Sequence, residues 1–172
     1  MNSRLIIIRG NSGSGKTTTA KRLRHELGYG TMLVSQDVLR REILRVKDGP
    51  NNPSIKLIYD TVMYGNTIGY DVILEGILAN KHYGNMLNRL VHDFHGTVFA
   101  YYFDLPFVET LKRHSTKTNS GEYGEAEMQE WWNNEDYLGI KQEKFFDQTH
   151  DEAQTLKKIL EDVSVKGSRP VS

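Results

Sequence analysis

A glycine-rich octet near the start of the sequence contains the residues most clearly suited to chemistry. It runs Gly10-Asn11-Ser12-Gly13-Ser14-Gly15-Lys16-Thr17 and fits the phosphate-binding pattern Gly-x-x-x-x-Gly-Lys-Thr completely. Glycines let the backbone curl until successive N–H groups point at phosphate oxygens. The lysine can reach the β- and γ-phosphates, and the following hydroxyl can bind Mg²⁺. The octet therefore predicts that the protein binds a nucleoside triphosphate.

The residues on either side of this octet support the prediction. Residues 5–8 are an apolar, β-branched run typical of a buried parallel strand. Residues 16–27 place Ala20, Leu23 and Leu27 on one face of a helix. A chance glycine-rich turn is the alternative, and it rarely has both a strand before it and a helix after it. We therefore assign residues 10–18, which include Thr18, to binding of the nucleoside triphosphate, with Lys16 also catalytic and Thr17 also a Mg²⁺ ligand.

A carboxylate and an arginine follow the second strand pattern, residues 32–35. The carboxyl ends of parallel strands are where ligands gather. Asp37 at that position can accept the proton of an attacking hydroxyl or hold the hydroxyl in line with the γ-phosphate. The alternative for Asp37 is a helix N-cap. Arg40 lies one helical turn further on the same face, and we expect it to bind substrate together with Asp37.

Two more acidic residues end strand patterns. Glu75 closes the pattern over residues 71–75, where a carboxylate can hold Mg²⁺ through water. We assign Glu75 to the metal and to substrate binding, with orientation of water or a plain surface carboxylate as alternatives. Asp104 follows the aromatic and β-branched run over residues 97–103, and we expect it to cap the next helix.

A polar stretch, residues 114–137, is expected to form a lid. Phosphoryl transfer requires that water be excluded from the site, and a closing segment can do this while supplying cations. Arg113 at its start is assigned to catalysis, since it can stabilise charge on the transferred group. Lys117 is assigned to substrate binding. The alternative for both is an ordinary helix C-terminus, where the helix dipole favours cations.

Two adjacent tryptophans lie in the same stretch. Core packing is the favoured interpretation for both Trp131 and Trp132. The alternative is that one of them closes over a ring-bearing substrate.

Strand and helix patterns alternate along the whole chain, which predicts a three-layer α/β/α fold with a parallel sheet. The expected strands cover residues 5–8, 32–35, 71–75 and 97–103. The expected helices cover residues 16–27, 37–46, 54–68, 80–94, 125–132 and 151–163, and one more has Pro106 in its first turn. We expect one domain over residues 1–172. Within it, residues 37–69 form a helical substrate-binding excursion and residues 164–172 a flexible tail.

Composition narrows the class of protein further. The 172 residues include 22 lysines and arginines against 22 acidic residues. Nucleic-acid-binding proteins are usually basic, so this balance argues weakly against them but leaves a local basic groove open. With no cysteines, disulfides, thiolate metal sites and a cysteine nucleophile are excluded. The apolar run near the start is too short for a signal peptide or a membrane helix, so we expect a cytoplasmic protein with no membrane partner.

The combination of these features resembles the small P-loop kinases. The resemblance rests on residues 10–17, on Asp37 with Arg40, on Glu75, and on residues 102–106 leading to Arg113. It is nearest to bacterial kinases described as uridine-kinase-like, zeta-toxin-like or chloramphenicol-phosphotransferase-like. The resemblance implies a five-stranded parallel sheet, ATP with Mg²⁺, and transfer of the γ-phosphate to a hydroxyl. It also implies that Asp37 is the base and Arg113 the lid arginine.

The sequence departs from that family in two places and leaves the acceptor open. Ser35-Gln36-Asp37 stands where a doubled acidic motif is usual, and the lid offers Arg113 and Lys117 rather than paired arginines. We expect a small hydroxyl compound as acceptor, such as a nucleoside, a sugar or an antibiotic-like molecule. The alternatives are a polynucleotide 5′-hydroxyl kinase, a zeta-toxin-like kinase and a nucleotide-binding regulatory module. The Asn-Lys-x-Asp element of GTPases is absent.

Overall fold

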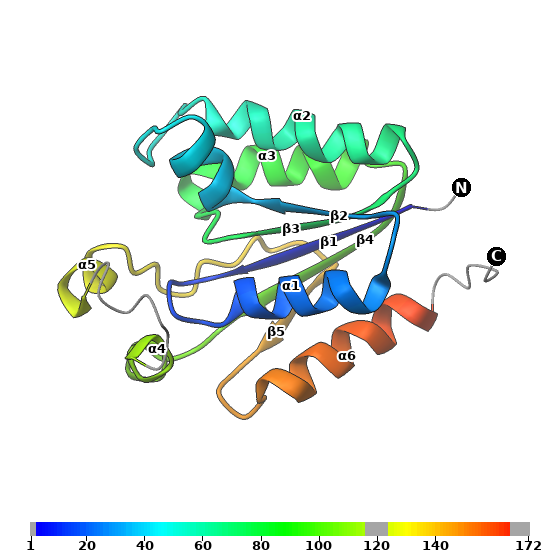
Figure 1. The fold of residues 1–172 in the computed structure, drawn as a ribbon. Helices are drawn as coiled ribbons and strands as arrows, with labels where there is room; N and C mark the ends of the chain where they lie inside the picture. Colours follow the sequence, from blue (N-terminus) through cyan, green and yellow to red (C-terminus); the bar gives the residue numbers. More distant parts are fainter. Residues whose placement is uncertain (1–2, 116–123, 166–172) are drawn as a thin grey trace.

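A parallel sheet of five strands forms the centre of the computed structural model, which describes residues 3–115 and 124–165 (Figure 1). The strands are β1 (Ser3–Gly10), β2 (Thr31–Ser35), β3 (Asp71–Gly76), β4 (Gly96–Phe103) and β5 (Glu143–Phe146). Their spatial order is β2-β3-β1-β4-β5, and every neighbouring pair is parallel. The carboxyl ends of all five strands therefore lie at one edge, with the phosphate-loop strand β1 in the middle.

Helices cover both faces of this sheet. Helices α2 (Ser54–Thr67) and α3 (Asn80–Asp93) lie on one face, and α1 (Lys16–Leu27) and α6 (Glu152–Val165) lie on the other (Figure 1). Successive residues of β1 point to opposite faces, so Leu5 and Ile7 join the first core while Ile6 and Ile8 join the second. Burial on both faces explains the unbroken apolar run of β1. The predicted three-layer fold is thus confirmed.

The shorter elements lie near the carboxyl edge of the sheet. They are the π-helix η1 (Val38–Ile43) and the helices α4 (Phe107–Ser115) and α5 (Glu125–Glu130). The helix predicted over residues 37–46 is confirmed only in its first part. Residues 36–43 are helical, and Val38–Ile43 have the wider hydrogen bonds of a π-helix rather than those of a regular α-helix. No helix of the described ranges is long and apolar enough to cross a membrane.

Two other boundaries differ from the sequence prediction. The C-terminal helix α6 continues to Val165, two residues into the expected tail, and the rest of that tail lies outside the described residues. Strand β5 was implied only by the family resemblance and was not located in the sequence. It has four residues, of which two are exposed, so it lacks the apolar run that marks the other strands.

Candidate active site

The phosphate loop joins β1 to α1 and depends on glycine at two positions for different reasons. Gly13 and Gly15 have φ angles of 77° and 93°, a region that residues with a side chain rarely adopt. Gly13 also lies against α4, and a Cβ there would stand 2.5 Å from the backbone oxygen of Thr110. Any larger residue at Gly13 would therefore push α4 away from the loop.

The polar groups of the loop fit a bound phosphate chain. The Nζ of Lys16 folds back over the loop and donates to the backbone oxygen of Asn11 at 3.0 Å. The Ser14 hydroxyl is buried and finds no hydrogen-bond partner among the described residues. Buried polar groups normally have a partner, and a phosphate oxygen would supply one.

Glu75 lies next to the loop, at the end of β3. Its carboxylate accepts hydrogen bonds from the hydroxyls of Thr17, at 3.0 Å, and Ser35, at 2.5 Å. The side chain is buried, and within the described ranges no lysine or arginine forms an ion pair with it. A buried carboxylate without a cation is costly, so a divalent cation between Glu75 and Thr17 would compensate it.

The donor set is small enough to favour Mg²⁺ bound together with phosphate. No cluster of three histidine, aspartate or glutamate side chains suited to a metal occurs in the part of the chain that the structure describes. Mg²⁺ in nucleotide sites typically takes only one or two protein ligands and fills its remaining positions with phosphate oxygens and water. Thr17 and Glu75 fit that arrangement.

Asp37 follows β2 and faces a cavity rather than capping a helix. It makes no side-chain cap to the backbone of η1, so the N-cap alternative does not describe it. Its carboxylate is 3.1 Å from Nη2 of Arg40, whose Nη1 donates to the backbone oxygen of Val46 at 3.2 Å. The side chain of Asp37 is still 60% exposed. Arg40 therefore orients Asp37 without covering it.

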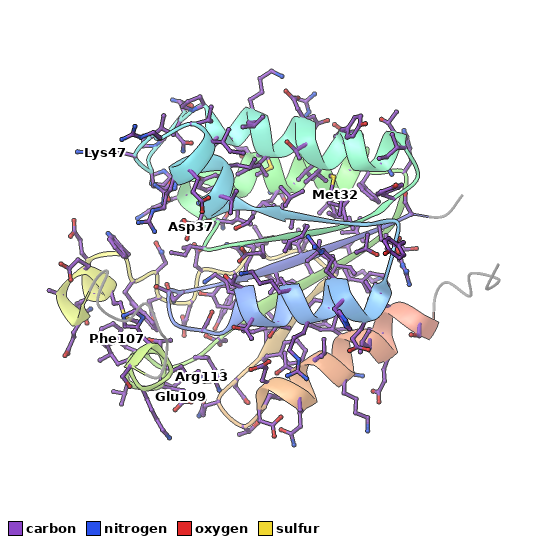
Figure 2. All side chains as sticks on the ribbon, viewed as in Figure 1. Met32, Asp37, Lys47, Phe107, Glu109 and Arg113 are labelled. Atoms are coloured by element: carbon purple, nitrogen blue, oxygen red, sulfur yellow. The ribbon has the colours of Figure 1, made fainter. Side chains whose placement is uncertain are left out.

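Arg113 reaches the phosphate loop from α4. Its Nη1 donates to the backbone oxygen of Ser14 at 3.3 Å, and its Nε pairs with Glu109 one turn earlier at 2.8 Å (Figure 2). This pairing holds the pKa of Glu109 below its ordinary value. The guanidinium is thus held beside the loop. Lys117 lies outside the described residues.

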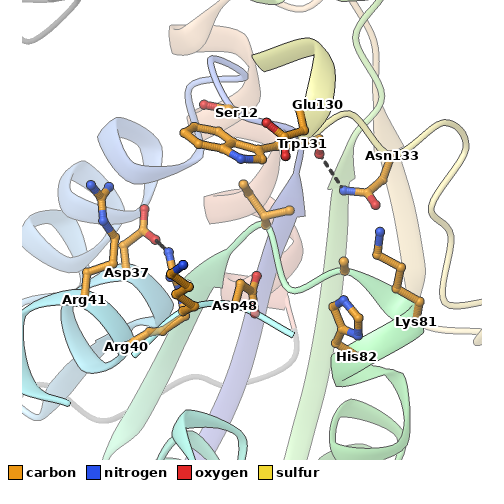
Figure 3. A pocket seen from close by; sticks show the side chains of 13 residues that line it. Ser12, Asp37, Arg40, Arg41, Asp48, Lys81, His82, Glu130, Trp131 and Asn133 are labelled. Atoms are coloured by element: carbon orange, nitrogen blue, oxygen red, sulfur yellow. Dashed lines mark hydrogen bonds and ion pairs between the residues drawn. The ribbon is translucent and has the colours of Figure 1, made fainter. Parts of the chain in front are cut away.

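A cavity of about 620 Å³ opens beside the loop at the carboxyl edge of the sheet (Figure 3). Its walls come from the loop, η1, the start of α3 and the end of α5. The lining residues are Ser12, Asp37, Arg40, Arg41, Lys47, Asp48, Ile77, Ala79, Lys81, His82, Glu130, Trp131 and Asn133. Pockets of this volume suit small molecules.

The two tryptophans have different surroundings. The ring of Trp132 packs edge-on against Phe107, with 5.1 Å between the ring centroids. Trp131 is 42% exposed and lines the cavity, where Figure 3 shows its indole near Ser12. Core packing is therefore wrong for Trp131, whose indole faces the cavity rather than the core.

Comparison with known proteins identifies the family. Residues 5–134 match the AAA domain family over most of the chain. The chain belongs to this family. Its membership, together with the loop, implies ATP binding. No curated protein sequence is detectably similar to this AAA-domain protein.

Solved structures with a similar fold include several small kinases. The APS kinase of Mycobacterium tuberculosis has a TM-score of 0.72 at 15% identity, covering 95% of this chain and 98% of that chain. A gluconokinase of Sinorhizobium meliloti has a TM-score of 0.67 at 15% identity, covering 97% and 98%. The Deinococcus radiodurans tunicamycin resistance protein has a TM-score of 0.67 at 19% identity, covering 98% and 100%. The AAA-domain chain therefore has the fold of a small P-loop kinase.

The expectation that Asp104 caps the next helix is wrong. Helix α4 of this AAA-domain protein begins at Phe107, too far along the chain for a cap by Asp104. The carboxylate instead accepts a hydrogen bond from the Tyr137 hydroxyl at 2.7 Å, and this bond raises the pKa of Tyr137 to about 12. Asp104 therefore fastens the segment after α5 to the end of β4.

A buried charge cluster under the site was not found from the sequence. Arg9, the residue before the phosphate loop, is fully buried and contacts Asp136 at 2.7 Å and Glu143 at 3.1 Å. It also donates to the backbone oxygen of Leu78. Burial lowers the pKa of the guanidinium, and the two carboxylates oppose this effect. One signal was present, since Arg9 directly follows the apolar run of residues 5–8.

Two amide side chains also position the site. Asn11 of the loop holds the backbone of Asn133, donating to its oxygen at 2.8 Å and accepting from its N–H at 2.9 Å. Gln36 is buried against Gly76 and accepts from the N–H of Leu78 at 2.9 Å. The first contact ties the cavity wall to the loop, and the second fixes the end of β2, and so Asp37, against the end of β3.

Proposed function

We propose that this protein is a kinase that transfers the γ-phosphate of ATP to a hydroxyl group of a small molecule. The observation that supports this most is the shared cavity, since Ser12 of the phosphate loop and Asp37 line the same space of about 620 Å³. An acceptor held there lies between the triphosphate and a carboxylate, the arrangement that in-line transfer needs.

The proposed roles follow from this placement. Asp37, oriented by Arg40, accepts the proton of the acceptor hydroxyl while that oxygen forms a bond to the γ-phosphorus. The bond between this phosphorus and the bridging oxygen breaks, and ADP leaves. Lys16 and Arg113 stabilise the negative charge on the transferred group.

Metal binding is assigned to Thr17 and Glu75. Mg²⁺, when bound, neutralises charge on the β- and γ-phosphates. Glu75 has no other cation among the described residues, and Ser35 holds its second oxygen. Substrate binding by Lys117 stays a prediction, as does closure of the region 114–137 over the site.

A screen of hydroxyl compounds with γ-labelled ATP tests the proposal. It includes nucleosides, sugars, aminoglycosides and 5′-hydroxyl oligonucleotides. Turnover of a small compound supports the proposal, whereas labelling of oligonucleotides alone favours a polynucleotide kinase. Slow ATP hydrolysis with no acceptor used favours a regulatory module or a toxin-like protein and would contradict the proposal.

Two substitutions test the residue roles once an acceptor is known. Lys16→Ala should abolish transfer. Asp37→Asn should lower kcat by about 10²–10⁴-fold and change ATP binding little, because its role is in the chemical step. Asp60→Asn is the matched control, since Asp60 is an exposed carboxylate of α2 that does not line the cavity. Full turnover in Asp37→Asn would exclude Asp37 as the base.

A further inference from the structure

The cavity next to the phosphate loop has an unusual charge pattern. Four cations line it, namely Arg40, Arg41, Lys47 and Lys81, against three carboxylates, namely Asp37, Asp48 and Glu130. The whole chain has equal numbers of cationic and acidic residues, so the cavity is more cationic than the protein as a whole.

Two of the three carboxylates already have partners inside the protein. Asp37 is paired with Arg40. Asp48 accepts hydrogen bonds from the Tyr83 hydroxyl at 2.8 Å and from the N–H of Gly49 at 3.0 Å. Both carboxylates are therefore held in place by groups of the protein, and the lining as a whole carries one cation more than it has carboxylates.

The three remaining cations lack such partners. Arg41, Lys47 and Lys81 are exposed, and in the described ranges none of them forms an ion pair. Figure 3 shows Lys81 across the cavity from Asp37 and Arg41. Lys81 also lies in the first turn of α3, where the carboxylate of Asp136 already accepts from the N–H of Asn80 at 2.9 Å, so the positive charge of this wall comes from the Lys81 side chain and not from the helix end. The wall opposite Asp37 is therefore electrostatically suited to an anion.

A histidine next to Lys81 adds to this wall. The Nδ1 atom of His82 is buried and has no hydrogen-bond partner among the described residues. His82 lines the same cavity, so a ligand oxygen would give this nitrogen a partner.

We propose that the acceptor is a small anionic hydroxyl compound, whose carboxylate, sulfate or phosphate group binds at Lys81 while its hydroxyl reaches Asp37. This inference rests on the proposed kinase function. Arg41 and Lys47 add positive charge along the opposite rim and attract the anion. Trp131 covers the non-polar part of the compound where its indole borders the cavity.

Matched pairs of acceptors test the charge requirement. In each pair the anionic member carries a carboxylate or a phosphate ester in place of one free hydroxyl position and keeps the other hydroxyls: glycerol and glycerate, glucitol and gluconate, uridine and uridine 3′-monophosphate. We expect γ-labelled phosphate to enter the anionic member at least tenfold faster. Equal or faster labelling of the neutral members would overturn the anionic acceptor and leave the kinase function intact. Preference for a 5′-hydroxyl oligonucleotide over uridine 3′-monophosphate would overturn the small-molecule class.

Lys81→Ala then tests where the anion binds. We expect about a tenfold rise in KM for the anionic acceptor, the effect of losing one charge-assisted hydrogen bond, with KM for ATP unchanged. Lys81→Arg should recover most of the loss. Lys21→Ala is the matched control, because Lys21 is an exposed cation of α1 outside the cavity. An equal KM in Lys81→Ala and Lys21→Ala would overturn the assignment of Lys81.

A binding measurement separates failure of this inference from failure of the kinase proposal. In Trp132→Phe, Trp131 is the only tryptophan left and reports on the cavity. With ADP and Mg²⁺ filling the phosphate loop, sulfate is titrated at constant ionic strength. A saturable fluorescence change that Lys81→Ala weakens about tenfold supports the anion site, even if no acceptor is phosphorylated. The absence of any saturable change would overturn it.

Discussion

Two cations at the same edge of the sheet, Arg9 and Lys81, have opposite surroundings. Arg9 is fully buried and contacts Asp136, Glu143 and a backbone oxygen. Lys81, at the cavity wall, is exposed and forms no ion pair in the described part of the chain. A charge whose partners are all inside the protein contributes to structure. A charge at a cavity without such partners is available for a ligand.

Glu75 shares one feature with Arg9, its burial, and one with Lys81, the lack of an ion pair among the described residues. It is buried like Arg9, but the described residues give it only hydroxyl partners and no cation. By the same comparison it belongs with the ligand-binding residues, and substitutions can test this division.

The largest expected effect is that of Arg9→Met on stability. Removing this cation leaves two buried carboxylates without compensation, which should cost about 3–5 kcal/mol of the free energy of unfolding. Urea denaturation measures it. Arg9→Lys, which keeps the charge but loses part of the hydrogen bonding, should cost less and serves if Arg9→Met does not fold. If Arg9→Met lost less than about 1 kcal/mol of the free energy of unfolding, Arg9 would not have the structural role that its buried ion pairs indicate.

Glu75→Gln should affect function more than folding. We expect about a 100-fold fall in kcat, or about 2.7 kcal/mol in the barrier, because a metal ligand is lost. In buffer without Mg²⁺ the variant should be as stable as the original or about 1 kcal/mol more stable, since an uncompensated buried charge becomes neutral. Phosphoryl-transfer assays over a range of Mg²⁺ concentrations and urea denaturation provide the two readouts. Strong destabilisation without Mg²⁺ would place Glu75 with Arg9 instead.

Asn11→Ala should have a moderate effect on stability. It removes both hydrogen bonds to the backbone of Asn133, which should cost about 1–2 kcal/mol. Asn133→Ala is the matched comparison, because it keeps both of these backbone bonds and removes only the bond that the Asn133 side chain donates to the backbone oxygen of Trp131 at 2.9 Å. Thermal denaturation compares the stability that each of the two variants loses. Equal losses would mean that the Asn11 side chain does not hold the cavity wall.

The smallest expected effect is that of Arg41→Ala and Lys81→Ala on stability. Exposed cations without ion pairs should change the free energy of unfolding by no more than about 0.5 kcal/mol. Urea denaturation of these two variants and of Arg9→Met under the same conditions compares their free energies of unfolding directly. If either variant lost more than about 1.5 kcal/mol of the free energy of unfolding, the replaced side chain would have a structural role, because substitutions at plain surface sites rarely cost that much.

The features predicted correctly from the sequence depend on residues close together in the chain or on general properties of parallel strands. The phosphate loop needs only glycine conformations and a helix start, all within residues 10–18. The proximity of Thr17 and Glu75 follows from parallel strands, whose carboxyl ends share one edge. Core strands were visible because burial on both faces requires unbroken apolar runs.

The features that were missed depend on distant partners. Arg9 meets carboxylates more than 120 positions away, and no local pattern shows which residues those are. The side-chain bonds of Asn11 span a similar separation. Strand β5 has only four residues and two of them are exposed, so its apolar signal is short. The π-helix η1 differs from an α-helix in its hydrogen bonds, which the apolar pattern does not report.

The packing of Gln36 on Gly76 has a consequence for how this sequence can change over evolution. A Cβ at position 76 would stand 2.5 Å from the Gln36 Oε1 and 2.6 Å from its Cβ, so a rotamer change alone could not relieve the clash. Because every residue except glycine has a Cβ, position 36 would have to become glycine, or the two backbones would have to move apart, before position 76 could gain a side chain. Relatives that still place an acidic residue after their second strand should therefore show correlated variation at these two positions.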